Sequence, residues 1–368
     1  MNSRRLSCLF VLAATLSLIP VPGICAPSTP SLSVAMQFLS AADPRFHYEG
    51  RFDLASPAGP VAIWQGSRIG LDFSGAQLVL HFDGIQGQNF FDVAVDDAIA
   101  VLSVPPGPGR RLVFPEHLGE GRHHLTVFKR SEAAAGWARF TGVEIAAGAK
   151  AWTPAEPAYR LRMEFFGDSI TAGACNEDGA TDQWENFRTH NNVRSYAALT
   201  AAALAADYRN IAVSGMGIAA GYVEVRAGQV WDRAYPVAGS RRADLNAWQP
   251  DVAFVNFGEN DDSFTRNNGQ PFPAGFTDGY VALVRGIRQA YPKAQLVLLR
   301  GGMFGGAQSA PLREAWETAV HQLEAGDPAI HSFVFTHWSA NHPRVADDRA
   351  MADELIAWLR ARDFIKTL

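Results

Sequence analysis

Residues 161–174 read LRMEFFGDSITAGA and decide the fold of the C-terminal part of this 368-residue chain. A short apolar run stops there at Gly167, a residue type that lets a strand turn sharply out of a sheet. Buried strands that alternate with helices predict a parallel sheet in a three-layer α/β/α domain over residues 153–368. The later strands are expected at 210–213, 252–257, 296–299 and 332–335, and the helices at 193–206, 276–291, 311–323 and 346–360.

The sequence before this domain has a different period. Apolar and polar residues alternate within 69–73, 78–82, 91–95 and 125–127, with Gly, Pro and Asp residues between these segments. A strand with this alternation buries one face and exposes the other. Several such strands without helical segments between them predict an antiparallel β-sandwich over residues 27–152.

Residues 1–26 have the composition of a secretory signal peptide. Arg4 and Arg5 precede an apolar stretch at 6–20, and small residues follow at 23–26. We therefore expect cleavage near the end of this segment and export to the periplasm or the medium. No later segment reaches about 18 consecutive apolar residues, so we expect a soluble product without a membrane span.

The charge balance narrows the range of partners. The chain has 32 Lys and Arg residues against 37 Asp and Glu residues, a formal net charge of −5 at pH 7. Proteins that bind nucleic acid need many cations to meet the phosphates, so we expect no nucleic-acid partner. The hydrophobic fraction of 48% is enough for packed cores and excludes a disordered protein.

Residues with catalytic potential follow four of the predicted parallel strands, namely Ser169, Gly215, Asn260 and His342. Ligands of parallel α/β sheets collect beyond the carboxyl ends of the strands, so we expect these residues to meet there. Each residue alone has a common structural explanation in a turn or a helix cap. Together they supply what acyl transfer needs: a hydroxyl nucleophile, an imidazole base and hydrogen-bond donors for a developing oxyanion.

The motifs around these residues resemble a known superfamily. Gly-Asp-Ser at 167–169, the turn at Gly215, Gly-x-Asn-Asp at 258–261 and His-Pro at 342–343 resemble the four signature blocks of the SGNH (GDSL) hydrolases. Residues 124–132, HLTVFKRSE, resemble part of the N-terminal domain of carbohydrate esterase family 2. Members of that family pair a jelly-roll domain with an SGNH domain and remove acetyl groups from plant polysaccharides such as xylan and glucomannan.

The resemblance implies a role for each candidate residue. Ser169 is expected to be the nucleophile and His342 the base that takes its proton. The Ser169 amide, Gly215 and Asn260 are expected to form the oxyanion hole. No metal and no organic cofactor is implied, and the sequence has no Walker motif, no Gly-x-Gly-x-x-Gly after a strand and no Cys-x-x-Cys.

The segment before His342 departs from the family pattern. Many SGNH enzymes have an Asp three residues before the histidine, where this chain has Ser339. Members of the esterase family more often have Asp-Trp directly before it, where this chain has Ala340 and Asn341. With no carboxylate at either place, we expect a Ser169–His342 dyad whose imidazole is oriented by a main-chain oxygen near Ser339.

The expected function is an exported serine esterase that removes O-acetyl groups from an oligo- or polysaccharide. Trp338 and Trp184 are candidates for the sugar-stacking surface, although each is equally compatible with packing. Two alternatives stay open. One is a catalytically inactive carbohydrate-binding protein on the same scaffold, favoured by the missing acid, and the other is an SGNH esterase for a different acyl ester.

Overall fold

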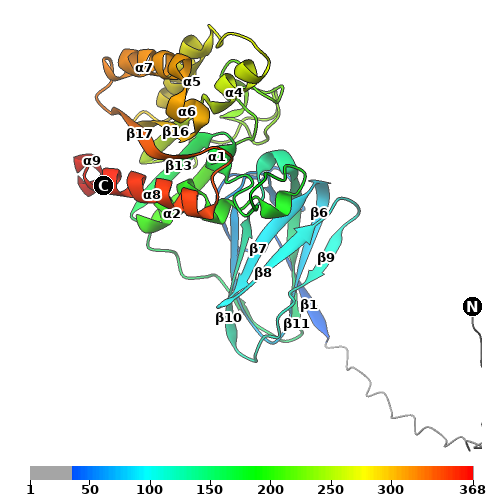
Figure 1. Cartoon of the computed structure of the whole chain (residues 1–368). Helices are drawn as coiled ribbons and strands as arrows, with labels where there is room; N and C mark the ends of the chain where they lie inside the picture. The colour runs from blue at the N-terminus through cyan, green and yellow to red at the C-terminus, as the bar shows by residue number, and fades with distance from the viewer. Residues whose placement is uncertain (1–34, 368) are drawn as a thin grey trace, which may run out of the picture. The chain divides into compact units, whose positions relative to one another are not determined.

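Alternating apolar residues place twelve strands of the N-terminal part in two antiparallel sheets (Figure 1), within residues 35–367 that the computed structural model describes. The predicted signal peptide at 1–26 lies outside the described residues. One sheet contains β1 (Met36–Ser40), β3 (Phe52–Asp53), β4 (Val61–Ala62), β6 (Leu78–Gly87), β9 (Arg110–Val113) and β11 (Gly136–Ala146). The other contains β2 (His47–Glu49), β5 (Arg68–Ser74), β7 (Asn89–Val95), β8 (Ala98–Val104), β10 (Arg122–Lys129) and β12 (Ala151–Trp152).

Strand β10 illustrates how the two-residue period builds the sandwich. It pairs antiparallel with β5 on one side and β7 on the other, so that Leu125 lies opposite both Leu71 and Val95. Leu125 and Val127 point inward and are fully buried, and the last inward position holds Lys129. The predicted antiparallel β-sandwich is confirmed.

The C-terminal part is built on a five-stranded parallel sheet in the order β14-β13-β15-β16-β17. The three central strands, β13, β15 and β16, are almost continuously buried, as their apolar runs predicted, whereas the edge strand β17 is largely half-buried or exposed. The bounds of the five strands are β13 (Leu161–Gly167), β14 (Ala206–Ala212), β15 (Val252–Asn256), β16 (Gln295–Met303) and β17 (Ile330–Ser339).

Helices cover both faces of this sheet. Met163 and Phe165 of β13 pack in one core with α2 (Tyr196–Ala203) and α8 (Val345–Arg360), whereas Phe166 faces the opposite core. That second core contains α5 (Phe276–Ala290) and α7 (Ala310–Glu324), and Figure 1 shows α5 beside α7 and α2 beside α8. The three-layer prediction is confirmed. The remaining α-helices of the described chain are α1 (Ser169–Ala172), α3 (Ala227–Val230), α4 (Glu259–Asn267), α6 (Phe304–Gln308) and α9 (Asp363–Thr367).

One helix differs from the prediction by several residues at both of its ends. The helix expected over 193–206 is shorter, because Ser195 caps its N-terminus with a side-chain bond to the Ala198 amide. At the other end Ala205 adopts φ 49°, a left-handed conformation that stops the helix before β14 begins. Among the described residues, no helix combines the length and the apolar composition needed to cross a bilayer.

Buried polar contacts join the sandwich to the parallel sheet. The Arg51 guanidinium donates to the Glu164 carboxylate of β13 at 2.8 Å, and Tyr291 donates to the second carboxylate oxygen at 2.6 Å. Trp64 Nε1 donates to the Ala234 carbonyl oxygen at 2.9 Å. Because these side chains are buried, each contact stabilises only when both partners are present.

Arg51→Ala is expected to lower the free energy of unfolding by about 3–5 kcal/mol, because it leaves the Glu164 carboxylate buried without its cation. Arg111→Ala removes an exposed ion pair with Glu144 and should cost at most about 1 kcal/mol. Urea denaturation followed by tryptophan fluorescence measures both values. Equal losses in the two variants would contradict the assigned importance of the buried pair.

Candidate active site

Ser169 stands where the first strand of the parallel sheet turns into α1. A side chain at Gly167 would put its Cβ 2.1 Å from Thr171 Oγ1, so only glycine fits this turn. Asp168 caps α1 by accepting the Ile170 amide at 3.1 Å. The local sequence thereby fixes Ser169 at the carboxyl end of β13, where it is 3% exposed.

His342 reaches the serine from the loop between β17 and α8. Its Nε2 atom lies 2.8 Å from Ser169 Oγ, although the two residues are 173 positions apart in the chain. The structure therefore brings together the two residues that the sequence analysis paired. At this distance the hydroxyl can donate a hydrogen bond to the imidazole and pass its proton along it.

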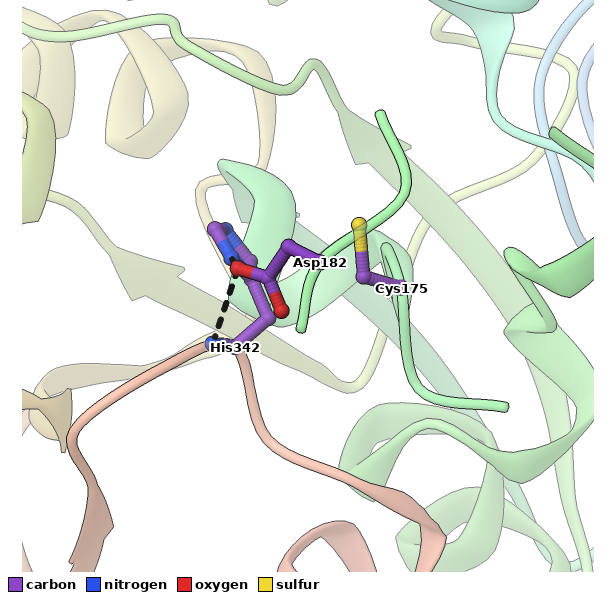
Figure 2. A group of neighbouring side chains, drawn as sticks. All are labelled: Cys175, Asp182 and His342. Atoms are coloured by element: carbon purple, nitrogen blue, oxygen red, sulfur yellow. Dashed lines mark hydrogen bonds and ion pairs between the residues drawn. The ribbon is translucent and has the colours of Figure 1, made fainter. Parts of the chain in front are cut away.

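The group that orients the His342 imidazole is a carboxylate. The predicted dyad, with a main-chain oxygen in this position, is therefore wrong. Asp182 Oδ2 lies 2.7 Å from His342 Nδ1, and Figure 2 shows this carboxylate beside the imidazole. Asp182 therefore occupies the position that was expected for a main-chain oxygen near Ser339. A carboxylate only accepts, so His342 carries its hydrogen on Nδ1 and leaves Nε2 free to accept from Ser169.

The sequence analysis missed Asp182 because this residue is close to Ser169 in sequence and far from His342. It lies 160 positions before His342, in the irregular segment between α1 and α2, and no local spacing links the two residues. Burial alone would raise the pKa of Asp182, but hydrogen bonding and charge from His342 and Arg344 lower it to about 2. Arg344 Nη1 contacts the other carboxylate oxygen at 2.8 Å. The carboxylate is therefore ionised at neutral pH.

The predicted oxyanion donors lie in the same cleft. Gly215 occupies the turn after β14 with φ 78°, and Asn260 lies in the first turn of α4. The Asn260 amide donates to the Met216 carbonyl oxygen at 3.1 Å and to Asp168 at 3.2 Å. These bonds hold the amide beside Ser169 at the cleft wall.

Asp261 is a positioning residue that the sequence analysis did not assign. Its buried carboxylate accepts from the amides of Ile218, Ala219 and Ala220 at 2.7 to 2.8 Å. These three amides belong to the loop that follows Gly215, so Asp261 joins the segments that carry the two predicted oxyanion donors. A carboxylate next to the oxyanion Asn, as in the motif Gly-x-Asn-Asp, was the available signal.

The cleft has a volume of about 580 Å³ and has a mixed polar and apolar wall. Trp184 lines it and packs edge-on against the His342 ring, with centroids 4.3 Å apart. Trp338 does not line the cleft; it contacts Phe304, which does. The lining residues are Ser169, Trp184, Ser214, Gly215, Tyr222, Val223, Glu259, Asn260, Ser263, Arg266, Asn267, Met303, Phe304, Ala340 and His342.

Three side chains with metal-ligating atoms lie together, and two of them are Asp182 and His342. Among the described residues, ligand atoms of Cys175, Asp182 and His342 lie within 4.8 Å of one another, and Figure 2 shows the three side chains. Burial raises the pKa of the Cys175 thiol, which opposes the thiolate that a metal needs. Asp182 and His342 already bond to each other, so this arrangement serves proton transfer better than metal binding.

Two family models match the chain. Residues 48–155 match the model described as "Carbohydrate esterase 2 N-terminal". Residues 165–360 match the "GDSL-like Lipase/Acylhydrolase family". The two matches cover the sandwich and the parallel-sheet part respectively.

Curated relatives agree with these matches. An acetylxylan esterase/glucomannan deacetylase of Cellvibrio japonicus is 30% identical over 341 residues, which span 86% of this chain and 91% of that protein. The cellulase/esterase CelE of Acetivibrio thermocellus is also 30% identical over 86% of this chain, but the match spans only 39% of CelE.

Solved structures show the same two-part arrangement. A family two carbohydrate esterase from Clostridium thermocellum, determined in complex with cellohexaose, is 29% identical with a TM-score of 0.75. That similarity covers 86% of this chain and 98% of the other. With matching models over both parts and a 30% identical relative aligned along nearly its whole length, the chain belongs to the family 2 carbohydrate esterases with a GDSL-type hydrolase domain.

Proposed function

We propose that this protein is an exported serine esterase that removes O-acetyl groups from plant polysaccharides such as xylan or glucomannan. The observation that carries the proposal is the hydrogen-bonded series Ser169–His342–Asp182 at the wall of a cleft, with distances of 2.8 and 2.7 Å. Family membership supports an acetyl ester as the substrate.

In the proposed reaction Ser169 Oγ attacks the acetyl carbonyl carbon while His342 Nε2 takes the hydroxyl proton. Asp182 keeps the imidazole in the required tautomer and stabilises the imidazolium. The developing oxyanion accepts hydrogen bonds from the Ser169 and Gly215 amides and from Asn260 in place of its contact to Asp168. His342 then protonates the sugar oxygen as the ester bond breaks.

Hydrolysis of the acetyl-enzyme repeats these roles with water as the nucleophile. His342 takes a proton from the water molecule, which attacks the acetyl carbon, and returns the proton to Ser169 as acetate leaves. No step needs a metal ion or an organic cofactor.

Features of the cleft support a carbohydrate substrate. Trp184, Tyr222 and Phe304 give its wall aromatic surface, and Arg266 and Asn267 supply hydrogen-bond donors. This combination of aromatic surface and polar groups suits a sugar chain. The related esterase bound to cellohexaose supports the same class of ligand for this chain.

Acetate release from a panel of acetylated mono- and polysaccharides tests the proposal, with Ser169→Ala as the control. Release by the wild type and none by the variant supports it. Retained polysaccharide binding without any turnover would favour the inactive binding protein. The missing acid was the main argument for that alternative, and Asp182 supplies a carboxylate at that position. Turnover of other acyl esters only would favour the second alternative.

Export is part of the proposal and rests on Arg4, Arg5 and the apolar stretch at 6–20. Cell fractionation and N-terminal sequencing of the mature protein test it. A cytoplasmic protein that retains residues 1–26 would contradict export and leave the esterase proposal untouched.

Trp184→Ala is expected to raise KM for acetylated xylo-oligosaccharides about 2- to 10-fold, because it removes aromatic surface from the cleft wall. Trp338→Ala is the matched control, since Trp338 is also a partly exposed tryptophan but does not line the cleft. Steady-state kinetics of both variants provide the measurement. A larger KM effect in Trp338→Ala would assign the sugar contact to Trp338 instead.

A further inference from the structure

A buried carboxylate of the sandwich, that of Glu132, contacts Ser214 in the wall of the cleft. Glu132 lies three residues after the end of β10 and is 1% exposed. Its Oε2 accepts the Ser214 amide at 2.9 Å, and its Oε1 accepts the Ser214 hydroxyl at 2.8 Å. His190 Nδ1 lies 3.0 Å from the same Oε1 atom. One side chain of the sandwich thus holds two different segments of the hydrolase part.

The first of these segments carries a proposed oxyanion donor. Ser214 immediately precedes Gly215, so a bond to the Ser214 amide fixes the chain directly before the Gly215 N–H. On the other side the Gly215 carbonyl oxygen accepts the Tyr222 amide at 2.8 Å. The Gly215 amide is therefore held between two anchors, and Glu132 provides the one that lies outside the hydrolase part.

The second segment, which contains His190, lies close to the orienting carboxylate Asp182. His190 Nε2 lies 3.4 Å from Cys175 Sγ, and Cys175 belongs to the loop that continues to Asp182. The His190 ring also contacts Trp184, which packs on the His342 ring. Glu132 is thereby connected through one residue to the surroundings of both Asp182 and His342.

The charge on Glu132 is maintained by its partners. Burial would raise the pKa of this carboxyl, but hydrogen bonds and charge from His190 and bonds from Ser214 lower it. The buried amino group of Lys129 donates hydrogen bonds to the carbonyl oxygens of Ser131 and Glu132 at 2.8 and 3.3 Å. Burial lowers the pKa of Lys129 to about 7. The acceptors for the Ser214 amide and hydroxyl are thus available at neutral pH.

We propose that Glu132 is a positioning residue for acyl transfer, through which the sandwich sets the Gly215 amide of the oxyanion hole. The inference rests on the proposed function. It gives the sandwich a role in the rate of the reaction, beyond any contact with the glycan. A merely structural Glu132 would affect stability and leave the chemistry of the folded enzyme unchanged.

Glu132→Gln tests this role. A glutamine side chain has a single oxygen, so it cannot accept the hydrogen bonds from the Ser214 amide, the Ser214 hydroxyl and His190 as the two carboxylate oxygens do. We expect kcat for nitrophenyl acetate to fall about 10- to 100-fold with KM changed less than about twofold. A misplaced donor weakens the stabilisation of the oxyanion in the transition state and leaves substrate binding unchanged. The rate at which a fluorophosphonate labels Ser169 should fall in parallel, because that reaction also develops charge on an oxygen beside Gly215.

Trp64→Phe is the matched control. It removes another buried hydrogen bond between the sandwich and the hydrolase part, from Trp64 to Ala234, and leaves the bonds from Ser214 to Glu132 in place. It should lower thermal stability and leave kcat unchanged. Ser214→Ala, which removes only the hydroxyl bond to Glu132, should lower kcat several-fold and serves if Glu132→Gln does not fold.

The outcomes separate this inference from the proposed function. An active, Ser169-dependent wild type whose kcat survives both Glu132→Gln and Ser214→Ala would overturn the role of Glu132 alone. A folded wild type that neither hydrolyses acetyl esters nor reacts with the fluorophosphonate would overturn both.

Discussion

Replacing Ser169 by alanine is expected to lower the rate of acetyl ester hydrolysis by about 10⁴- to 10⁶-fold, since the cleft then has no hydroxyl next to His342. The residual rate over water comes from binding and from the oxyanion donors alone. The variant should fold normally, because the Ser169 side chain is small and Asp168 still caps α1. Acetate release in a coupled assay measures the effect.

Ser332→Ala provides the control for this loss. Ser332 lies within β17, away from the cleft lining, and its replacement should leave the rate within about twofold of wild type. Activity of Ser169→Ala within tenfold of wild type would exclude Ser169 as the nucleophile.

Asp182→Asn is expected to lower kcat by about 10⁴-fold, as loss of the orienting acid does in serine proteases. An asparagine amide directed at Nδ1 favours the hydrogen on Nε2, and that tautomer cannot accept the Ser169 proton. The wild-type carboxylate has its pKa lowered to about 2, so it is ionised throughout the range from pH 5 to 8. The defect should therefore persist across that range in a pH–rate profile.

Asp96→Asn is the matched control for this variant. Asp96 also lies 2.7 Å from a histidine, His123, but in the sandwich and outside the cleft lining. Asn tolerates the left-handed φ of 52° at this position, so the backbone should not be strained. An Asp182→Asn enzyme with nearly full activity would restore the hypothesis of a serine–histidine dyad oriented without a charge.

Residues that follow a regular strand were predictable, and those in irregular segments were not. Ser169 lies two residues after β13 and His342 three residues after β17, so the rule for parallel sheets placed both at one edge. Asp182 lies in a segment without periodicity, whose path over His342 is set by tertiary contacts such as that to Arg344. A search for the acid near His342 in sequence therefore missed it.

The role inferred for Glu132 illustrates the same limit. The stretch HLTVFKRSE at 124–132 stood out in sequence only as a family resemblance. Its two-residue period correctly predicted the inward direction of Leu125 and Val127. The partners of Glu132, Ser214 and His190, are 82 and 58 positions away, so their meeting depends on how the sandwich packs against the hydrolase part.

The buried pair of Arg51 and Glu164 has a consequence for engineering with this chain. A truncated protein that begins after residue 152 would keep Glu164 and lose Arg51. It would then carry the Glu164 charge without its partner at the surface that the sandwich had covered. In a chimera that takes one half from a relative, the imported half needs the charge that matches Arg51 or Glu164 in the retained half. A chimera in which either position lacks the matching charge is expected to be less stable than the parent protein.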